Sequence, residues 1–333
     1  MRSFLVTGGA GFIGSNIVAG LAQRFPNAYI AVSDFLGSDD KWRNISGVYP
    51  DEVISPNEIF YWMEQHRSDL DAVIHMGAIS STTVTDADAM LEANIGLSKV
   101  LYGWCAQNNK RFIYASSAST YGAGELGFID RDDLEYLKAL QPLNTYAWSK
   151  TAFDYFVMRM VAHDADQPAQ WAGLKFFNVY GPNEYHKADQ QSVISKIYPA
   201  VRDGEAVKLF KSHHPDYTDG GQERDFIYVK DCVNVVLWFI ENSNVASGLY
   251  NVGTGQARSF ADLARATFAA AQQAEHIEYI DMPENLQPRY QYFTQADVTK
   301  LRQVGYMEPF TSLEDGVHDY VQHYLSQENP YIK

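Results

Sequence analysis

A glycine-rich loop near residue 10 constrains the fold more than any other feature of this sequence. Gly8, Gly11 and Gly14 recur at every third position, after the apolar run Phe4–Thr7 and before a helical pattern that starts at Asn16. Small residues at this spacing allow a tight turn, close approach of the backbone to a pyrophosphate, and close packing of the helix on the strand. Because the first N–H groups of a helix have no partners within it, we expect the diphosphate of a dinucleotide to bind at this helix N-terminus.

Apolar runs and helical patterns alternate along the first half of the chain. The predicted strands are Phe4–Thr7, Ala28–Ser33, Ala72–His75, Arg111–Ala115 and Gly173–Phe177. The predicted helices include Met90–Gln107 and Tyr146–His163. This alternation indicates a parallel sheet that is doubly wound, with helices on both faces. The predicted fold class is α/β: a doubly wound parallel (Rossmann) sheet with a smaller, partly interleaved α/β substrate domain.

The expected domain division follows the point where this alternation weakens. Past about Asn178 the sequence contains clusters of Gly, Pro and His, for example at 181–183 and 213–215. We therefore expect residues 1–176, plus about 224–255, to form the dinucleotide-binding Rossmann domain. We expect residues from about 177–223, plus 256–333, to form the substrate-binding domain.

Charge and composition exclude several classes of protein. The net charge of −15 argues against nucleic acid as a partner, because a phosphate backbone requires a basic surface. No run approaches about 18 apolar residues and the start lacks a signal-peptide layout, so we expect a cytoplasmic protein without a membrane partner. The isolated Cys105 and Cys232 predict neither a disulfide framework nor a metal site. The adjacent His213 and His214 lack a metal-ligand spacing.

The acid at the end of the second predicted strand bears on the choice of cofactor. Asp34 follows Gly14 by 20 residues, where an acid typically binds the adenosine ribose hydroxyls, and this favours NAD. Lys41 and Arg43 follow shortly and could neutralise a 2′-phosphate, which favours NADP. The residues therefore predict a nicotinamide cofactor and leave the choice between the two open.

A tyrosine and a lysine four residues apart predict a proton-transfer group. In a helix, Tyr146 and Lys150 would lie on one face and within mutual reach. A free tyrosine has a pKa near ~10, and a nearby ammonium lowers it. Ser117 follows a predicted strand, at the edge where doubly wound sheets bind ligands, so we expect it to hydrogen-bond the reacting oxygen. We expect Ser116 and Thr120 to be structural.

Together these motifs resemble the extended short-chain dehydrogenase/reductase superfamily over nearly the whole chain. Within it, the chain resembles the ADP-L-glycero-D-manno-heptose 6-epimerase family of nucleotide-sugar epimerases. The glycine loop and the segment around Ser117 are common to such epimerases. More particular to the heptose family are SSTT at 80–83, HK at 186–187 and FTQAD at 293–297.

The resemblance implies an isomerase that inverts C6 of ADP-D-glycero-β-D-manno-heptose, giving the L-glycero product for the inner core of lipopolysaccharide. The implied cofactor is NADP, with NAD as the alternative. The cofactor would take a hydride from C6, leaving a transient carbonyl, and would return the hydride to the opposite face of that carbon. The resemblance assigns the two proton-handling roles to Tyr146 and Lys187. It makes Lys150 the residue that orients the nicotinamide ribose and tunes Tyr146, and Ser117 the one that polarises the sugar oxygen. It also implies a homo-oligomer, a homopentamer.

Two sets of binding residues are carried over by the same resemblance. The cofactor set is Gly8, Gly11, Phe12, Ile13, Gly14, Asp34, Phe35, Lys41, Gly77, Ala78, Asn94, Lys150 and Val179. The substrate set is Ser80, Asn178, Lys187, Lys196, Phe210, Arg224 and Tyr290. The planar fork of arginine suits phosphate oxygens, which independently favours Arg224. An ion pair with Asp225 is its structural alternative.

The sequence also departs from the family pattern. Phe35 stands where the family has Asn or Lys, which leaves Lys41 to carry a preference for NADP. The stretch Ser212–Glu223 is longer than the family's loop, so we expect substrate-phosphate recognition to be rearranged. An unperturbed lysine has a pKa of ~10.4, so Lys187 needs burial or a nearby cation, such as His186 or Lys150, to act as a base.

Three other functions compete with this interpretation. A UDP-hexose 4-epimerase shares every Rossmann and Tyr/Lys feature, and only the downstream segments separate the two. A dehydratase is less favoured, because Ala118 and Ser119 stand where those enzymes carry an Asp-Glu pair, and β-elimination needs a proton donor there. A non-catalytic NADP-binding sensor is opposed by the presence of all four proposed catalytic residues.

Overall fold

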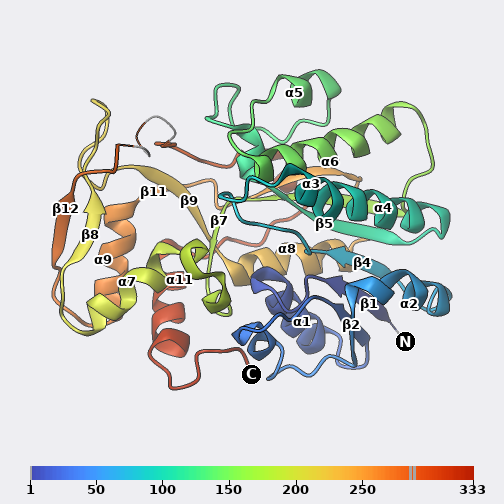
Figure 1. The fold of residues 1–333 in the computed structure, drawn as a ribbon, viewed down its shortest axis with the longest axis horizontal. Coiled ribbons are helices and arrows are strands. Elements are labelled where there is room, and N and C mark those ends of the chain that lie inside the picture. Colours follow the sequence, from blue (N-terminus) through green and yellow to red (C-terminus); the bar gives the residue numbers. More distant parts are fainter. Residues whose placement is uncertain (1, 285–286, 288–289) are drawn as a thin grey trace.

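The central sheet of the computed structural model is parallel throughout. The structure describes residues 2–284, 287 and 290–333. Within them, seven strands form this sheet in the order β10-β6-β5-β4-β1-β2-β3. The strands are β1 (Ser3–Thr7), β2 (Tyr29–Ser33), β3 (Glu52–Ile54), β4 (Ala72–His75), β5 (Arg111–Ser117), β6 (Gln170–Phe176) and β10 (Gly248–Val252). The predicted doubly wound parallel sheet is therefore confirmed (Figure 1).

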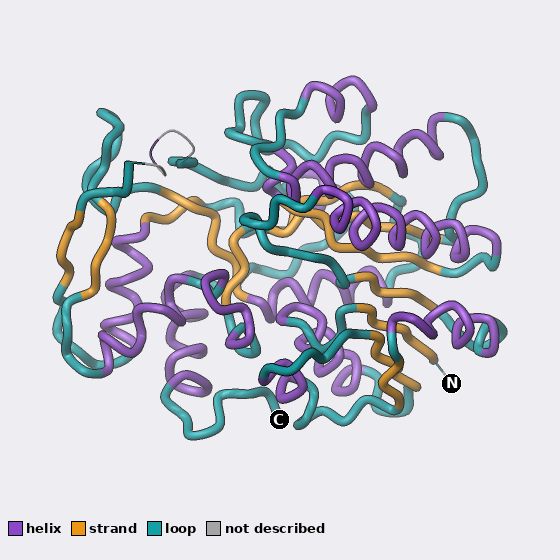
Figure 2. The backbone as a smooth tube through the Cα atoms, in the orientation of Figure 1, coloured by secondary structure: helices purple, strands orange, loops and turns teal. Residues whose placement is uncertain are grey.

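Helices cover both faces of this sheet. Because successive side chains of a strand point to opposite faces, Leu5 of β1 joins one hydrophobic cluster, while Phe4 and Val6 join another. The first cluster includes residues of α2, α4 and α6, and the second includes residues of α1 and α8. Figure 2 shows helices on both sides of the strands. These helices are α1 (Phe12–Arg24), α2 (Ile59–Gln65), α4 (Leu97–Gln107), α6 (Thr145–Ala162) and α8 (Val229–Glu241).

Two smaller sheets lie at the other end of the molecule, on the left in Figure 1. In one, β9 (Glu223–Tyr228) pairs with β7 (Asn178–Tyr180) and β11 (Ala257–Ser259); in the other, β8 (Val207–Phe210) pairs with β12 (Ile277–Ile280). The helices beside them are α7 (Val193–Arg202), α9 (Phe260–Ala270) and α11 (Leu313–Tyr320). Strand β10 returns the chain to the central sheet between β9 and β11. The exact domain division stays a prediction.

Two strands of the central sheet and one helical irregularity were not predicted from the sequence, nor were the strands of the two smaller sheets. Strand β3 has only three residues, and β10 mixes glycine and asparagine with apolar residues. The predicted helix Met90–Gln107 contains a π-helical turn, Leu91–Gly96, between α3 (Ala87–Met90) and α4. The remaining short helices are α5 (Leu134–Ala139) and α10 (Thr299–Gln303). No helix in the described part of the chain has both the length and the hydropathy needed to cross a bilayer.

Candidate active site

A cavity of about 520 Å³ opens at the carboxyl edge of the central sheet. Doubly wound sheets bind ligands at this edge. Its walls come from the glycine loop, the segments that follow β2, β4, β5 and β6, the start of α6, and the 3₁₀ turn Tyr185–Gln190. The predicted site residues that line it are Gly8, Gly11, Phe12, Ile13, Gly14, Asp34, Lys41, Gly77, Ala78, Ser80, Ser117, Tyr146, Lys150, Val179 and Lys187. One cavity thus brings together all four proposed catalytic side chains.

The glycine loop forms a cradle that larger side chains would fill. Gly8 has φ of +64°, and a Cβ there would lie 2.5 Å from the Gly77 nitrogen. A Cβ on Gly14 would lie 2.1 Å from the Gly8 carbonyl oxygen. Helix α1 begins after Gly11 without a side-chain cap, so its first N–H groups face the cavity rim unpartnered by a side chain. These residues fit the diphosphate of a dinucleotide.

The acid at the end of β2 already holds the loop and a cation. Asp34 accepts hydrogen bonds from the Ala10 backbone N–H (3.0 Å) and from Lys41 Nζ (2.6 Å). Lys41 Nζ also donates to the Phe35 carbonyl at 3.0 Å. Phe35 itself is 62% exposed and does not line the cavity. Lys41 is thus a cation on the cavity wall beside the end of β2.

Helix α6 places Tyr146 and Lys150 on the wall of the cavity. The Asn144 side chain caps the helix by accepting from the Ala147 N–H at 2.8 Å. The Lys150 amine lies 6.0 Å from the centre of the Tyr146 ring and donates to the Ala115 carbonyl at 2.8 Å. Burial lowers the pKa of Lys150 to about 8, although the charge of Asp154 opposes the change.

The tyrosine titrates differently from the sequence-based expectation. Burial raises the pKa of Tyr146, and interaction with the Ser117 hydroxyl opposes the rise only in part. The expected lowering by Lys150 is wrong for this structure, because burial has the largest effect on the pKa of Tyr146 and raises it. Tyr146 is therefore protonated at neutral pH, and Lys150, with a pKa of about 8, is mostly protonated there.

A buried ion pair supports this wall from behind. Asp154 follows Lys150 by one helical turn and pairs with Lys175 Nζ at 2.6 Å, with side-chain exposures of 0% and 1%. The hydroxyls of Tyr114 and Ser116 also donate to Asp154, at 3.0 and 2.7 Å. Ser116 therefore has the structural contact that we expected, although it also lines the cavity.

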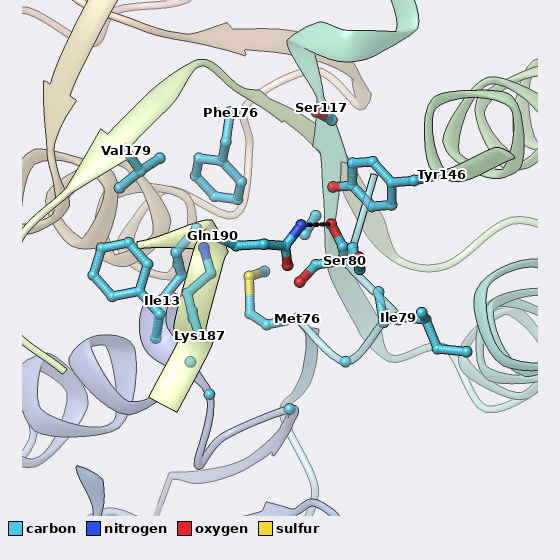
Figure 3. Close-up of a pocket in the computed structure, with 18 of the residues that line it drawn as sticks. Ile13, Met76, Ile79, Ser80, Ser117, Tyr146, Phe176, Val179, Lys187 and Gln190 are labelled. Carbon is cyan, nitrogen blue, oxygen red and sulfur yellow. Dashed lines mark hydrogen bonds between the residues drawn. The ribbon is translucent and has the colours of Figure 1, made fainter. Parts of the chain in front are cut away.

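Lys187 faces the cavity from the 3₁₀ turn, opposite Tyr146. Figure 3 shows the two on different sides, with Gln190 reaching between them to donate to the Ser80 carbonyl at 3.3 Å. The Lys187 amine lies 5.2 Å from the centre of the Phe12 ring. Burial lowers the pKa of Lys187 and the charge of Lys196 lowers it further, while Glu184 raises it.

The second cation near Lys187 is therefore Lys196 and not His186. Burial, with Lys41 and Lys187 nearby, lowers the pKa of His186 to about 4, so the ring is neutral at pH 7. Its Nδ1 lies 3.1 Å from the side-chain nitrogen of Asn44, which makes Nδ1 the acceptor. The expectation that His186 would assist as a cation is wrong.

Several predicted residues lie outside the cavity lining. Asn94 is buried and fixes the loop after β4 through the N–H and carbonyl of Ile79. Asn178 accepts from the Thr294 hydroxyl at 3.3 Å, and Lys196 Nζ donates to the Asp189 carbonyl. The residues that the structure places away from the lining are Phe35, Asn94, Asn178, Lys196, Phe210, Arg224 and Tyr290.

Arg224 lies among aromatic rings. Its guanidinium lies 5.5 Å from the centre of the Tyr290 ring and 5.6 Å from that of Phe260, and Phe210 packs edge-on against Tyr290. The structural alternative, an ion pair with Asp225, is not formed. Asp225 accepts instead from backbone and side-chain groups that include Thr254. Within the described residues, the buried cation donates to backbone carbonyls alone.

Sequence reasoning did not select several residues that line the cavity. They are Met76, Ile79, Ser81, Ala115, Phe176, Phe177, Ala188 and Gln190. Most flank a selected motif, so proximity to it was the available signal. No sequence signal marked Gln190 as a site residue, because its position depends on the turn that follows Lys187. In the described part of the chain, no group of three or more His, Cys, Asp or Glu side chains could hold a metal ion.

Comparison with known proteins assigns this chain to a family. Residues 4–253 match the family described as "NAD dependent epimerase/dehydratase family". The chain belongs to this family. A dependence of the family on a nicotinamide dinucleotide agrees with the glycine cradle, and the predicted nicotinamide cofactor is confirmed at that level.

Several similar relatives within the family share the name of one enzyme. The chain is 46% identical to an ADP-L-glycero-D-manno-heptose-6-epimerase of Fusobacterium nucleatum subsp. nucleatum, over 98% of this chain and 99% of the relative. It is 48% identical to an enzyme of the same name from Nitratidesulfovibrio vulgaris (strain DP4), over 99% and 100%. The resemblance inferred from the motifs is confirmed.

Solved structures of the family share the fold. The Helicobacter pylori ADP-L-glycero-D-manno-heptose-6-epimerase superposes with a TM-score of 0.76 at 28% identity, covering 96% of this chain and 95% of that one. The UDP-glucose 4-epimerase of Thermus thermophilus, in complex with NAD, gives 0.72 at 26% identity, covering 97% and 98%.

Proposed function

We propose that this protein inverts C6 of ADP-D-glycero-β-D-manno-heptose, giving the L-glycero epimer that lipopolysaccharide inner cores contain. The observation that carries the proposal is the placement of Lys187 opposite Tyr146 across a cavity with a dinucleotide cradle. Inversion through a carbonyl requires proton handling on both faces of the reacting carbon. The relatives named as 6-epimerases give the substrate.

The two proton-handling residues suit opposite halves of the reaction. Bound at the glycine cradle, a nicotinamide supplies the acceptor and donor of the C6 hydride. Lys187, with its lowered pKa, accepts the hydroxyl proton during oxidation. Tyr146, with its raised pKa, donates a proton during reduction on the opposite face, while Ser117 hydrogen-bonds the sugar oxygen. Proton exchange with solvent then restores both groups, and the reverse reaction uses them in the opposite order.

We propose that the protein uses NADP as its cofactor. Lys41 lines the cavity beside the end of β2 and is already held by Asp34. A 2′-phosphate brings negative charge to this point, and the lysine can neutralise it. We also carry over from the resemblance a cytoplasmic location and a homopentamer. Light scattering of the purified chain measures the subunit number directly.

A stereochemical assay tests the proposed reaction. The protein is incubated with ADP-D-glycero-β-D-manno-heptose, and the configuration at C6 is followed by NMR. Inversion supports the proposal. No inversion, with rapid conversion of UDP-glucose instead, would show a hexose 4-epimerase. Mass measurement of the nucleotide released on denaturation decides between NADP and NAD.

A further inference from the structure

Glu184 is a buried carboxylate three residues before Lys187. The residue has 0% exposure and precedes the 3₁₀ turn that carries the lysine. Burying a charge is costly unless hydrogen bonds compensate: burial raises the pKa of this carboxyl, while hydrogen bonds from Ser192 and Tyr320 lower it. The Lys187 backbone N–H donates to the Glu184 carbonyl at 3.0 Å, so the two residues share one turn of chain.

Four donors hold this carboxylate. Oε1 accepts from the Ser192 hydroxyl at 2.7 Å, from the Tyr320 hydroxyl at 3.0 Å and, at 3.5 Å, from the Gly181 backbone N–H. Oε2 accepts from the Ser192 backbone N–H. Ser192 caps α7, and Tyr320 is the last residue of α11. Glu184 therefore fastens the lysine-bearing turn to two helices.

Glu184 is also the negative charge that acts on the Lys187 amine. It raises the pKa of Lys187, against burial and against the charge of Lys196 from α7. The other groups nearby are the neutral ring of His186 on the same turn, the Phe12 ring of α1, and Tyr146 across the cavity. Removing the charge on Glu184 leaves Lys187 with cationic and neutral neighbours.

We propose that Glu184 is the positioning residue for Lys187: it fixes the turn that aims the amine into the cavity and supplies the charge that balances Lys196. The proposal rests on the function proposed above for Lys187. On the opposite wall, the buried charge of Asp154 likewise raises the pKa of Lys150 and of Tyr146, although Asp154 is itself paired with Lys175.

The variant Glu184→Gln removes the charge and keeps the shape. An amide oxygen at the Oε2 position still accepts from the Ser192 N–H, while an amide nitrogen at the Oε1 position donates to the two hydroxyls. Hydroxyl groups can turn to accept, so both hydroxyl contacts survive, and only the long contact from the Gly181 backbone N–H is lost. Tyr320→Phe is the matched control, because it removes one hydrogen bond and leaves the charge in place.

The readout is the titration of Lys187 in the full chain. Trace acetylation with acetic anhydride is measured across pH by peptide mass spectrometry, with Lys196 followed in the same digest. We expect the Lys187 midpoint to move to lower pH in Glu184→Gln and to stay at the wild-type value in Tyr320→Phe. An unmoved midpoint in a folded Glu184→Gln protein overturns the proposal.

This readout separates the present proposal from the proposed reaction, because acetylation needs no turnover. A lowered midpoint supports the role of Glu184 whether or not the heptose is epimerised. If Glu184→Gln does not fold, the variant Glu184→Asp is tested in its place. The shorter aspartate side chain cannot reach Ser192 and Tyr320 from the same backbone. We then expect the rate of Lys187 acetylation at neutral pH to change at least about threefold, and a wild-type rate counts against the proposal.

Discussion

The residue after Lys187 stores strain at the edge of the cavity. Ala188 has φ of +45° and ψ of −118°, a conformation that favours glycine. Such a residue costs of order 1–3 kcal/mol and persists where its surroundings hold it. Here the neighbouring Glu184 anchors and the Gln190 contact do so.

Relieving this strain should stabilise the protein. We expect Ala188→Gly to raise the free energy of unfolding by up to about 1 kcal/mol, because lost strain exceeds the added entropy of the unfolded chain. Urea denaturation measures the change. Ala188→Val is the matched comparison and should destabilise the protein, so equal stability of the two variants would contradict the strain assignment.

Removing both proton-handling groups should stop the reaction without emptying the cofactor site. We expect Tyr146→Phe combined with Lys187→Met to lower the epimerisation rate by at least about 10³-fold, given ~10²–10⁴ per general acid or base. Each single variant should keep more activity than the pair. The NMR assay gives the rate, and the absorbance of released nucleotide shows cofactor retention. A wild-type rate in the double variant would disprove the two-residue assignment.

Among the elements, the turn between β1 and α1 has no room for a side chain at Gly14. A Cβ on Gly14 would lie 2.1 Å from a backbone oxygen that cannot move alone. We therefore expect Gly14→Ala to bind NADP at least about tenfold more weakly and to unfold more easily by about 1–3 kcal/mol. Titration calorimetry and urea denaturation measure both changes.

Gly103 in α4 provides the control for this substitution. A Cβ there would meet nothing within 4 Å. Because alanine is a better helix former than glycine, Gly103→Ala should leave NADP affinity unchanged and stabilise the chain by about 0.5–1 kcal/mol. Weaker NADP binding by Gly103→Ala would mean that the Gly14 effect is not specific to the cradle.

The elements that sequence predicts well are those with a local signal. The glycine spacing gave the loop, and the predicted strand Ala72–His75 coincides with β4. The second cation near Lys187 depends instead on α7 packing beside the turn, so the nearer His186 was chosen wrongly. Glu184 was not selected, because a glutamate beside polar residues usually lies in solvent. Its burial arises only when α7 and α11 meet the turn.

At the scale of the whole molecule, one buried histidine links stability to pH. His75 of β4 is 2% exposed and lies between the hydroxyls of Thr7 (2.6 Å) and Ser98 (2.8 Å). Burial, with Lys150 nearby, lowers its pKa to about 3. Below about pH 6.5 the unfolded chain therefore binds a proton that the folded chain does not.

Mild acidification should consequently weaken the fold. From this group alone we expect the free energy of unfolding to fall by about 2 kcal/mol between about pH 7 and pH 5. Urea denaturation at several pH values measures the slope. His75→Gln should make the slope shallower over this range, with the remainder carried by groups such as His186, whose pKa is also lowered. A slope as steep as that of the wild type would exclude His75 as a source.

The buried pair of Asp154 and Lys175 has a consequence for how such a sequence can diverge. Losing one partner strands a charge inside the protein, which costs about 3–5 kcal/mol, whereas replacing both with apolar residues of similar volume is often neutral. The two positions should therefore change together or not at all. In a library of variants selected for folding, single replacements at either position should become rare, while matched double replacements persist. The two positions should then co-vary although they lie far apart in the sequence.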